Sequence, residues 1–71
     1  MAWIRLTTKN GRDVVINTQH IAYIAVPPEE EAERGIGAGI VFSDNLGEIF
    51  PVKEDWQDIA QKIGIGEIMR L

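Results

Sequence analysis

Few side chains in this sequence belong to the types that carry out catalysis. There are no cysteines, so no thiolate can bind a metal or attack a substrate, and His20 is the single histidine. Nucleophilic catalysis needs a hydroxyl beside a base that a third group orients, and no motif places such a base next to Ser43 or a threonine. His20 follows a polar connection, which is typical of a turn or surface residue. We therefore expect a protein that is not an enzyme and that uses no cofactor or metal.

An acidic run and a glycine-rich run follow each other in the middle of the chain. Glu29, Glu30, Glu31 and Glu33 could do acid–base chemistry, but a flexible segment does not hold carboxylates in a fixed geometry. The run is interpreted as a solvated charged segment, with a cation site or a partner-docking site as the alternative; the spaced ligands of an EF-hand loop are absent. The glycines in 35–39 lack the full phosphate-binding spacing and precede a strand instead of a helix.

Nucleic acid is an unfavourable partner for this composition. Seven Lys and Arg residues against eleven Asp and Glu residues give a formal net charge of −4, whereas binding to phosphates draws on basic side chains. Small barrels bind single strands on aromatic platforms within a basic groove. Trp3, Tyr23 and Trp56 are available as platforms, but nothing in the sequence brings the basic residues together. Those basic residues are Arg5, Lys9, Arg12 and Lys53.

The length and the hydropathy indicate one small soluble domain. The chain has 71 residues, of which 45% are hydrophobic, and this is too apolar for a disordered chain. A core of this size contributes only a few kcal/mol of net stability. No apolar run approaches the ~20 residues of a membrane span, and the first residues lack a signal-peptide pattern. We expect a cytoplasmic protein that does not enter a membrane.

Residues 3–9 and 12–16 are expected to form a β-hairpin. A two-residue turn would place the apolar residues of the two strands on different faces. A three-residue loop at 9–11 places them all on one face, with Gly11 in the left-handed conformation of a G1 bulge, so we prefer this register. The pairs are then Leu6 with Val14 and Ile4 with Ile16.

Residues 20–26 are expected to form a third strand, which is apolar on both faces and therefore placed in the middle of the sheet. Pro27 and Pro28 end it, because neither can donate a ladder hydrogen bond. Residues 27–38 are predicted to be a mobile surface loop, with a single helical turn at 28–34 as the alternative.

Residues 40–43 and 48–52 are expected to form a second hairpin that repeats the first with an offset of 36 residues. Gly47 would adopt the left-handed conformation that is predicted for Gly11 in the first hairpin. Phe42 would then pair with Phe50 and Ile40 with Val52, and Asp44 would face Glu48. Pro51 indicates an edge position or a bulge.

A closing helix is predicted at 55–63. Asp55 is a suitable N-cap, and Trp56, Ile59, Ala60 and Ile63 follow with the spacing of an amphipathic stripe. Gly64 would end the helix. Residues 1–64 therefore form a single β-rich domain, and 65–71 form an apolar C-terminal tail that continues as a helix or adds a strand.

The expected fold class is mainly β (α+β). It is a small five-stranded antiparallel curved sheet or an SH3-like barrel with one C-terminal helix, supported by the sixteen Ile and Val residues. One helix cannot cover both faces of the sheet, so Trp3, Val15 and either Tyr23 or Ile24 need other cover. A closed barrel is one solution, and a protein partner or a second copy is the other. The expected interaction surface consists of Trp3, Val15, Tyr23, Trp56, Ile65, Ile68, Met69 and Leu71.

The sequence resembles the FlbD-like flagellar and swarming-motility proteins over about residues 4–63. The residues that carry the resemblance are Leu6-Thr-Thr-Lys-Asn-Gly11, Val15-Ile-Asn17, Ile21, Ile24, Asn45-Leu-Gly47, Val52-Lys-Glu54, Ile59 and Ile63. The chain departs from that family in the acidic and glycine-rich segment 27–39, in Asp55 where a serine is typical, and in its tail. The resemblance implies a small cytoplasmic accessory protein that binds other proteins and has no catalytic residues.

A second resemblance, to LytTR DNA-binding domains, rests on a similar rhythm of strands. Its residues are His20-Ile-Ala-Tyr-Ile24, Ile40-Val-Phe-Ser-Asp44, Glu48-Ile49 and the closing helix. It implies the alternative function, a nucleic-acid-binding small barrel in a regulator.

Overall fold

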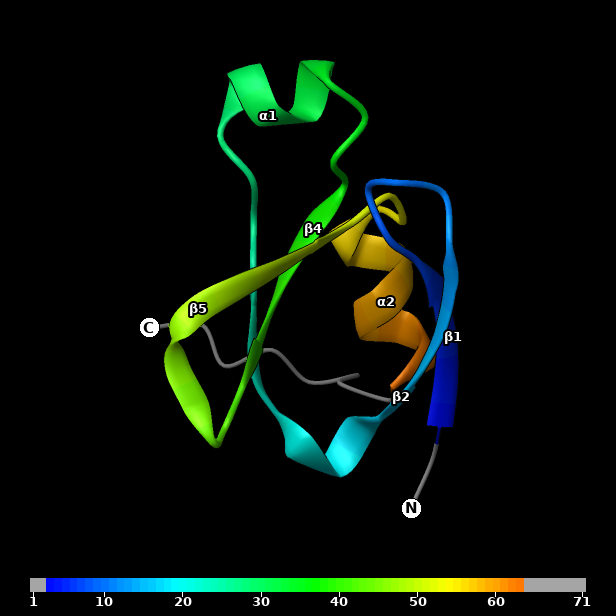
Figure 1. The fold of residues 1–71 in the computed structure, drawn as a ribbon, viewed down its shortest axis with the longest axis vertical. Coiled ribbons are helices and arrows are strands. Elements are labelled where there is room, and N and C mark those ends of the chain that lie inside the picture. Colours follow the sequence, from blue (N-terminus) through cyan, green and yellow to red (C-terminus); the bar gives the residue numbers. More distant parts are fainter. Residues whose placement is uncertain (1–2, 64–71) are drawn as a thin grey trace.

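The computed structural model describes residues 3–63, which form a small, mainly β domain of five antiparallel strands with two α-helices (Figure 1). The elements, in chain order, are β1 (Trp3–Thr7), β2 (Asp13–Asn17), the 3-10 turn η1 (Thr18–His20), β3 (Ile21–Ala25), α1 (Glu29–Glu33), β4 (Ala38–Phe42), β5 (Asn45–Val52) and α2 (Trp56–Lys62). The coarse prediction of a mainly β domain with a closing helix is therefore confirmed.

The first hairpin has the predicted register. Ile4 pairs with Ile16 and Leu6 pairs with Val14. Gly11 has a φ of 86°, in the left-handed region that a residue with a side chain enters only at a cost. The turn closes because the Gly11 N–H donates to the Thr8 carbonyl oxygen, at 2.9 Å.

The second hairpin does not have the predicted register. Ile40 pairs with Phe50, and Phe42 pairs with Asn45. Four residues of β5, 46–49, therefore lie opposite the single residue Val41 of β4 and form a bulge. The chain reverses at Ser43-Asp44, and Gly47 lies inside this bulged part of β5 with no left-handed φ. The sequence repeat was misleading because the Ser43 N–H and hydroxyl both donate to the His20 carbonyl oxygen, at 2.8 and 3.2 Å, and anchor the earlier turn.

The central strand of the three-stranded sheet is β4, not the predicted 20–26 strand. The order is β3-β4-β5, so β3 lies at an edge. Residues 38–41 are all buried, whereas Ala22 and Tyr23 of β3 are exposed. Pro51 lies on the other edge strand, as predicted, where a missing N–H does not break the centre of the sheet.

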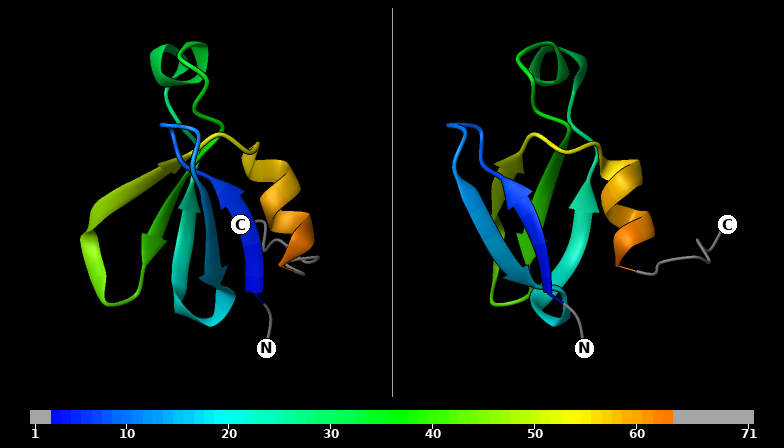
Figure 2. Two further views of the ribbon diagram at one scale, coloured as in Figure 1. Left: turned by 45° about the vertical axis from the view of Figure 1, so that its right-hand side comes forward. Right: turned by 90° about the vertical axis from the view of Figure 1, so that its right-hand side faces the viewer.

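The five strands form two sheets instead of the predicted single sheet, and no closed barrel is found among the described residues. One sheet contains β1 and β2, and the other contains β3, β4 and β5. They meet at one corner, where Thr8 and Val52 form an isolated bridge and the Lys53 N–H donates to the Thr7 carbonyl oxygen, at 2.9 Å. Figure 2 shows the two sheets facing each other with α2 beside β3.

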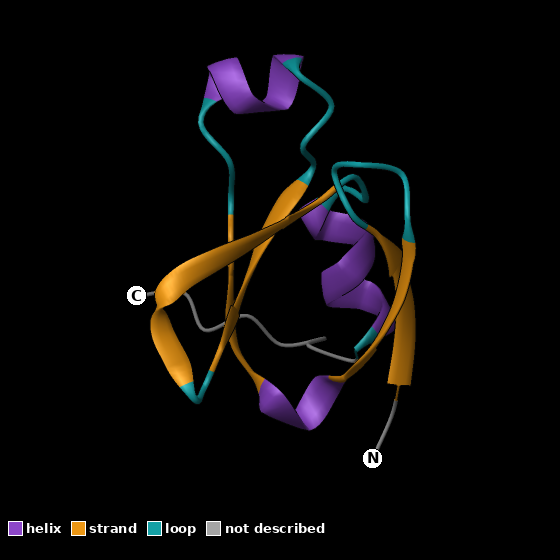
Figure 3. Ribbon diagram, viewed as in Figure 1, coloured by secondary structure: helices purple, strands orange, loops and turns teal. Residues whose placement is uncertain are grey.

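The predicted loop 27–38 contains the helix α1, as the alternative of a single helical turn proposed (Figure 3). Its C-terminal end explains why it forms. Gly35 has a φ of 92°, and the N–H groups of Gly35 and Ile36 donate back to the carbonyl oxygens of Ala32 and Glu31. Ile36 is buried just beyond this end, so the segment is tied to the domain.

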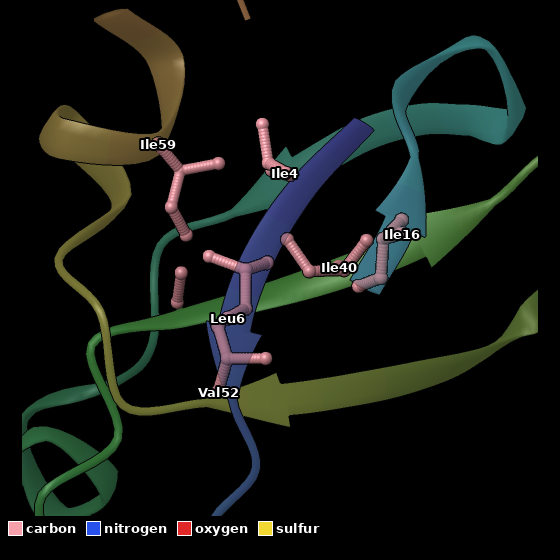
Figure 4. Close-up of a cluster of buried hydrophobic side chains, with 7 residues drawn as sticks. Ile4, Leu6, Ile16, Ile40, Val52 and Ile59 are labelled. Carbon is pink, nitrogen blue, oxygen red and sulfur yellow. The ribbon is translucent and has the colours of Figure 1, made fainter. Parts of the chain in front are cut away.

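The core lies between the sheets and α2. Figure 4 shows its side chains converging from four strands and the helix. All eight apolar residues that were predicted to pair within the two hairpins belong to this cluster, although Val14, Phe42 and Phe50 are only partly buried. The eight are Ile4, Leu6, Val14, Ile16, Ile40, Phe42, Phe50 and Val52.

The helix α2 follows its predicted stripe. Ile59 is fully buried, while Trp56 and Ile63 pack against the core from the same side. Asp55 occupies the N-cap position, but its side chain makes no capping hydrogen bond. The predicted role of Gly64 and the predicted tail 65–71 lie outside the described residues.

Candidate functional site

The outer face of the first hairpin exposes two large apolar side chains. Trp3 and Val15 lie on the face opposite to the buried Ile4 and Ile16, because side chains alternate along each strand. Trp3 is 59% exposed and Val15 is 61% exposed. We call this surface, made by Trp3, Val15 and the hollow beside them, the Trp3 face.

The hollow beside these residues has a volume of about 430 Å³. Its walls come from both sheets: Trp3, Val15 and Asn17 from the hairpin, and Phe42 from β4. His20 and Asp44 add one imidazole and one carboxylate at its rim. A surface of this kind offers apolar contact with a few polar groups at the edge, which is the make-up of many protein interfaces.

The position of this face is set by a hydrogen-bonded clamp at the other end of β1. One carboxylate oxygen of Glu54 accepts from the Thr7 backbone N–H at 2.8 Å, and the other accepts from the Thr7 hydroxyl at 2.9 Å. Glu54 lies in the connection between β5 and α2. The clamp therefore fixes the hairpin relative to the second sheet and the helix.

The protonation of Glu54 reflects this environment. Burial raises the pKa of its carboxyl, but three donors favour the charged form: the Thr7 N–H, the Thr7 hydroxyl and the N–H of Glu54 itself. The positive charge of Lys62 acts in the same direction. The net result is a pKa below the ordinary value of 4.5, so the clamp is ionised at neutral pH.

The predicted interaction residues do not form one surface. Tyr23 is 54% exposed but belongs to β3, in the other sheet. Trp56 is half-buried against the core and borders a separate hollow near α1, with Lys53 and Ile36. The remaining predicted residues lie outside the part of the chain that the structure describes: Ile65, Ile68, Met69 and Leu71.

Three further exposed apolar side chains were missed by the sequence analysis. Val26 is 60% exposed, Leu46 is 60% exposed and Ile49 is 61% exposed. The sequence holds a partial signal for each, since Val26 precedes two prolines and the other two residues lie within two positions of Gly47. The register error hid the last two, because a turn at Gly47 does not predict that β5 bulges there.

The chemistry of titratable groups adds little in residues 3–63. Within them no group of three or more His, Asp and Glu side chains is close enough to hold a metal ion. His20 is exposed at the end of η1, where its backbone carbonyl, not its imidazole, makes the contacts to Ser43. In the same residues no helix has the length and apolar character needed to cross a membrane.

Comparisons with known proteins add no family. No family model, no curated protein and no solved structure matches the chain.

Proposed function

We propose that the protein is a non-enzymatic protein-interaction module that associates with a second copy of itself through the Trp3 face. The observation that carries this proposal is the exposure of Trp3 and Val15, diagonal neighbours on one face of a sheet that has two strands among residues 3–63. Tryptophan is among the side chains that contribute most of the energy of an interface when they become buried, and an aliphatic neighbour helps to exclude water from it.

The free edge of β2 favours a second copy over an unrelated partner. Among the described strands, β2 pairs only with β1. Two-stranded sheets are marginal in water, and a free strand edge pairs readily with another chain. Antiparallel pairing of β2 with β2 of a second copy obeys two-fold symmetry and, with Val15 opposite Val15, packs the two valines together on one side of a four-stranded sheet, with a Trp3 ring diagonal to each.

Sedimentation velocity over a wide concentration range tests this proposal. We expect the mass of the protein to rise toward that of a dimer. The double variant Trp3→Ser, Val15→Thr should stay monomeric, because partial burial of Trp3 and Val15 together contributes about 2 kcal/mol, a factor of about 30 in the dissociation constant. Leu46→Ser is the matched control, since Leu46 is equally exposed on the other sheet. A monomer at every concentration contradicts the proposal.

One observation favours the alternative function, binding to nucleic acid. The hydrogen bond from Lys53 to Thr7 brings this lysine beside the hairpin that carries Lys9 and Arg12. Lys53 also lines the hollow that the half-buried Trp56 borders, and basic side chains beside an aromatic ring are a feature of single-strand binding surfaces. A gel shift with single-stranded and duplex DNA at low and high salt tests it, and the absence of any shift at low salt rejects it.

The resemblance to FlbD-like proteins is part of the same proposal. It makes the protein an accessory factor of the motility apparatus, and neighbouring flagellar genes would support that assignment. The bridge between Thr8 and Val52, which joins the two sheets at one corner, supports describing the fold as an open SH3-like barrel.

A further inference from the structure

A second apolar surface lies at the end of the molecule that carries α1. A groove of about 320 Å³ runs between the end of β3, the segment that follows α1, and β5. Its walls include Val26, Pro27, Ile36, Ile49 and Pro51, and Gly39 lines it from β4. We call it the α1 groove. It lies away from the Trp3 face, and no residue lines both.

Ile49 of β5 forms the floor of the α1 groove, because β4 contributes no side chain at Gly39. A Cβ added to Gly39 would lie 2.5 Å from Cγ2 of Ile49, so the Ile49 side chain rests directly against this glycine. Ile49 and Val26 nevertheless stay about three-fifths exposed. Apolar side chains of an incoming segment can therefore bury these two residues without any rearrangement of the sheet.

Among the described residues that line the α1 groove, the side chains include one hydrogen-bond acceptor and no donor. Three of its lining residues are prolines, which have no N–H. Glu31 supplies the one charged side chain of the lining, and it belongs to a helix in which four of five residues are glutamate. These glutamates are all exposed, and Arg34, which follows them directly, is the one basic residue of the segment 27–38. The groove therefore matches a ligand that is apolar, positively charged and rich in donors.

We propose that the α1 groove binds a short segment of another protein in which apolar side chains alternate with Lys or Arg. The apolar side chains occupy the groove between Val26 and Ile49, and the cationic groups lie along Glu31 and its neighbours on α1. This inference rests on the proposed function as a protein-interaction module, but it concerns a different surface and a different partner from the Trp3 face.

Fluorescence anisotropy with a short labelled peptide of alternating lysine and leucine tests the proposal. We expect saturable binding to the full chain. Ile49→Ala should weaken it by about tenfold, because the substitution removes three side-chain carbons that the bound peptide partly buries. Leu46→Ala is the matched control, since Leu46 is equally exposed on the same strand but does not line the groove. Equal weakening by both variants overturns the proposal.

Charge is tested with a second pair of variants. Glu31→Lys should weaken binding by about fivefold, the factor for a rim ion pair of about 1 kcal/mol. Asp58→Lys changes the net charge by the same amount at an exposed residue of α2 that lines neither the α1 groove nor the Trp3 face, and it should leave the affinity within a factor of two. If both variants act alike, the peptide responds only to net charge and the proposed site is wrong. A peptide with serine in place of leucine should not bind.

Amide chemical shifts separate this proposal from the proposed function. The lysine–leucine peptide should shift the amides of Ala25, Val26 and Gly39 and leave those of Trp3 and Val15 unchanged. Peptide binding by a protein that stays monomeric upholds the α1 groove and rejects dimerisation through the Trp3 face. A dimer whose α1 groove amides do not respond to the peptide upholds dimerisation and rejects the groove, and loss of the dimer in Ile49→Ala assigns the groove to a second copy.

Discussion

Gly37 is the position where a single added methyl group should do the most damage. Its N–H donates to the Val52 carbonyl oxygen at 2.9 Å, and its carbonyl accepts from the Trp56 N–H at 3.0 Å. A Cβ there would lie 2.5 Å from the carbonyl oxygen of Lys53 and closer still to that of Glu54. Both are backbone atoms, which cannot rotate away as a side chain does.

The cost of Gly37→Ala follows from these contacts. Overpacking costs about 1–3 kcal/mol, and weakening one of the two hydrogen bonds adds about 1 kcal/mol. A domain of this length loses about 4–8 °C of Tm per kcal/mol, so we expect Tm to fall by about 10–30 °C. Thermal unfolding followed by circular dichroism measures this change.

Gly47→Ala is the control for this prediction. A Cβ at Gly47 meets no atom within 4 Å, and this glycine has no left-handed φ. The substitution should leave Tm unchanged or raise it slightly, because alanine reduces the entropy of the unfolded chain. Equal Tm values for the two variants would refute the close approach of Gly37 to the connection between β5 and α2.

Three further predictions concern the clamp, the core and the first turn. Glu54→Ala should destabilise the fold by about 1–3 kcal/mol in urea unfolding at pH 7, because the half-buried Thr7 N–H loses its acceptor. Since the folded pKa of Glu54 lies below 4.5, its contribution is complete above the unfolded pKa and disappears as the pH falls through the folded pKa. The destabilisation by Glu54→Ala should therefore shrink in acid, and an unchanged difference at pH 3 would contradict the clamp. Leu6→Ala should cost about 2–5 kcal/mol by opening a cavity at a fully buried site, whereas Val15→Ala should cost less than 1 kcal/mol, and urea midpoints compare them. Gly11→Ala should cost about 1 kcal/mol from its left-handed φ alone, and a stability equal to that of the natural chain would show that the turn does not need this conformation.

Much of the fold was predictable where local chemistry and burial agree. In the first hairpin, only one register aligns Ile4 and Leu6 with their partners, and Gly11 supplies the conformation that this register needs. The stripe of α2 was predictable for the same reason. Although the predicted register of the second hairpin was wrong, it placed the correct apolar residues toward the core, because residues two positions apart on a strand share a face.

The errors arise where a distant contact decides the local structure. The bond from Ser43 to the His20 carbonyl selects the Ser43-Asp44 turn, and no pattern within the second hairpin reports it. The helix α1 was underestimated because Gly35 was counted as a flexible residue, although a glycine after a run rich in Glu and Ala is also a helix stop.

The interaction surface was predictable one residue at a time but not as a surface. Exposure of Trp3 and Val15 follows from strand alternation. The separation of Tyr23 from them follows from the division into two sheets, and Trp56 lies on α2 against the core. The α1 groove depends on the bulge in β5, since this bulge exposes Ile49.

Contact between two copies of this chain through their Trp3 faces can be detected by isotope-filtered NMR. A mixture of labelled and unlabelled protein is examined for nuclear Overhauser effects between different molecules. We expect such effects between the methyl groups of Val15 in one copy and the β2 residues or the Trp3 ring of the other. A concentrated sample in which every effect of Val15 is confined to its own molecule would contradict the proposed dimer.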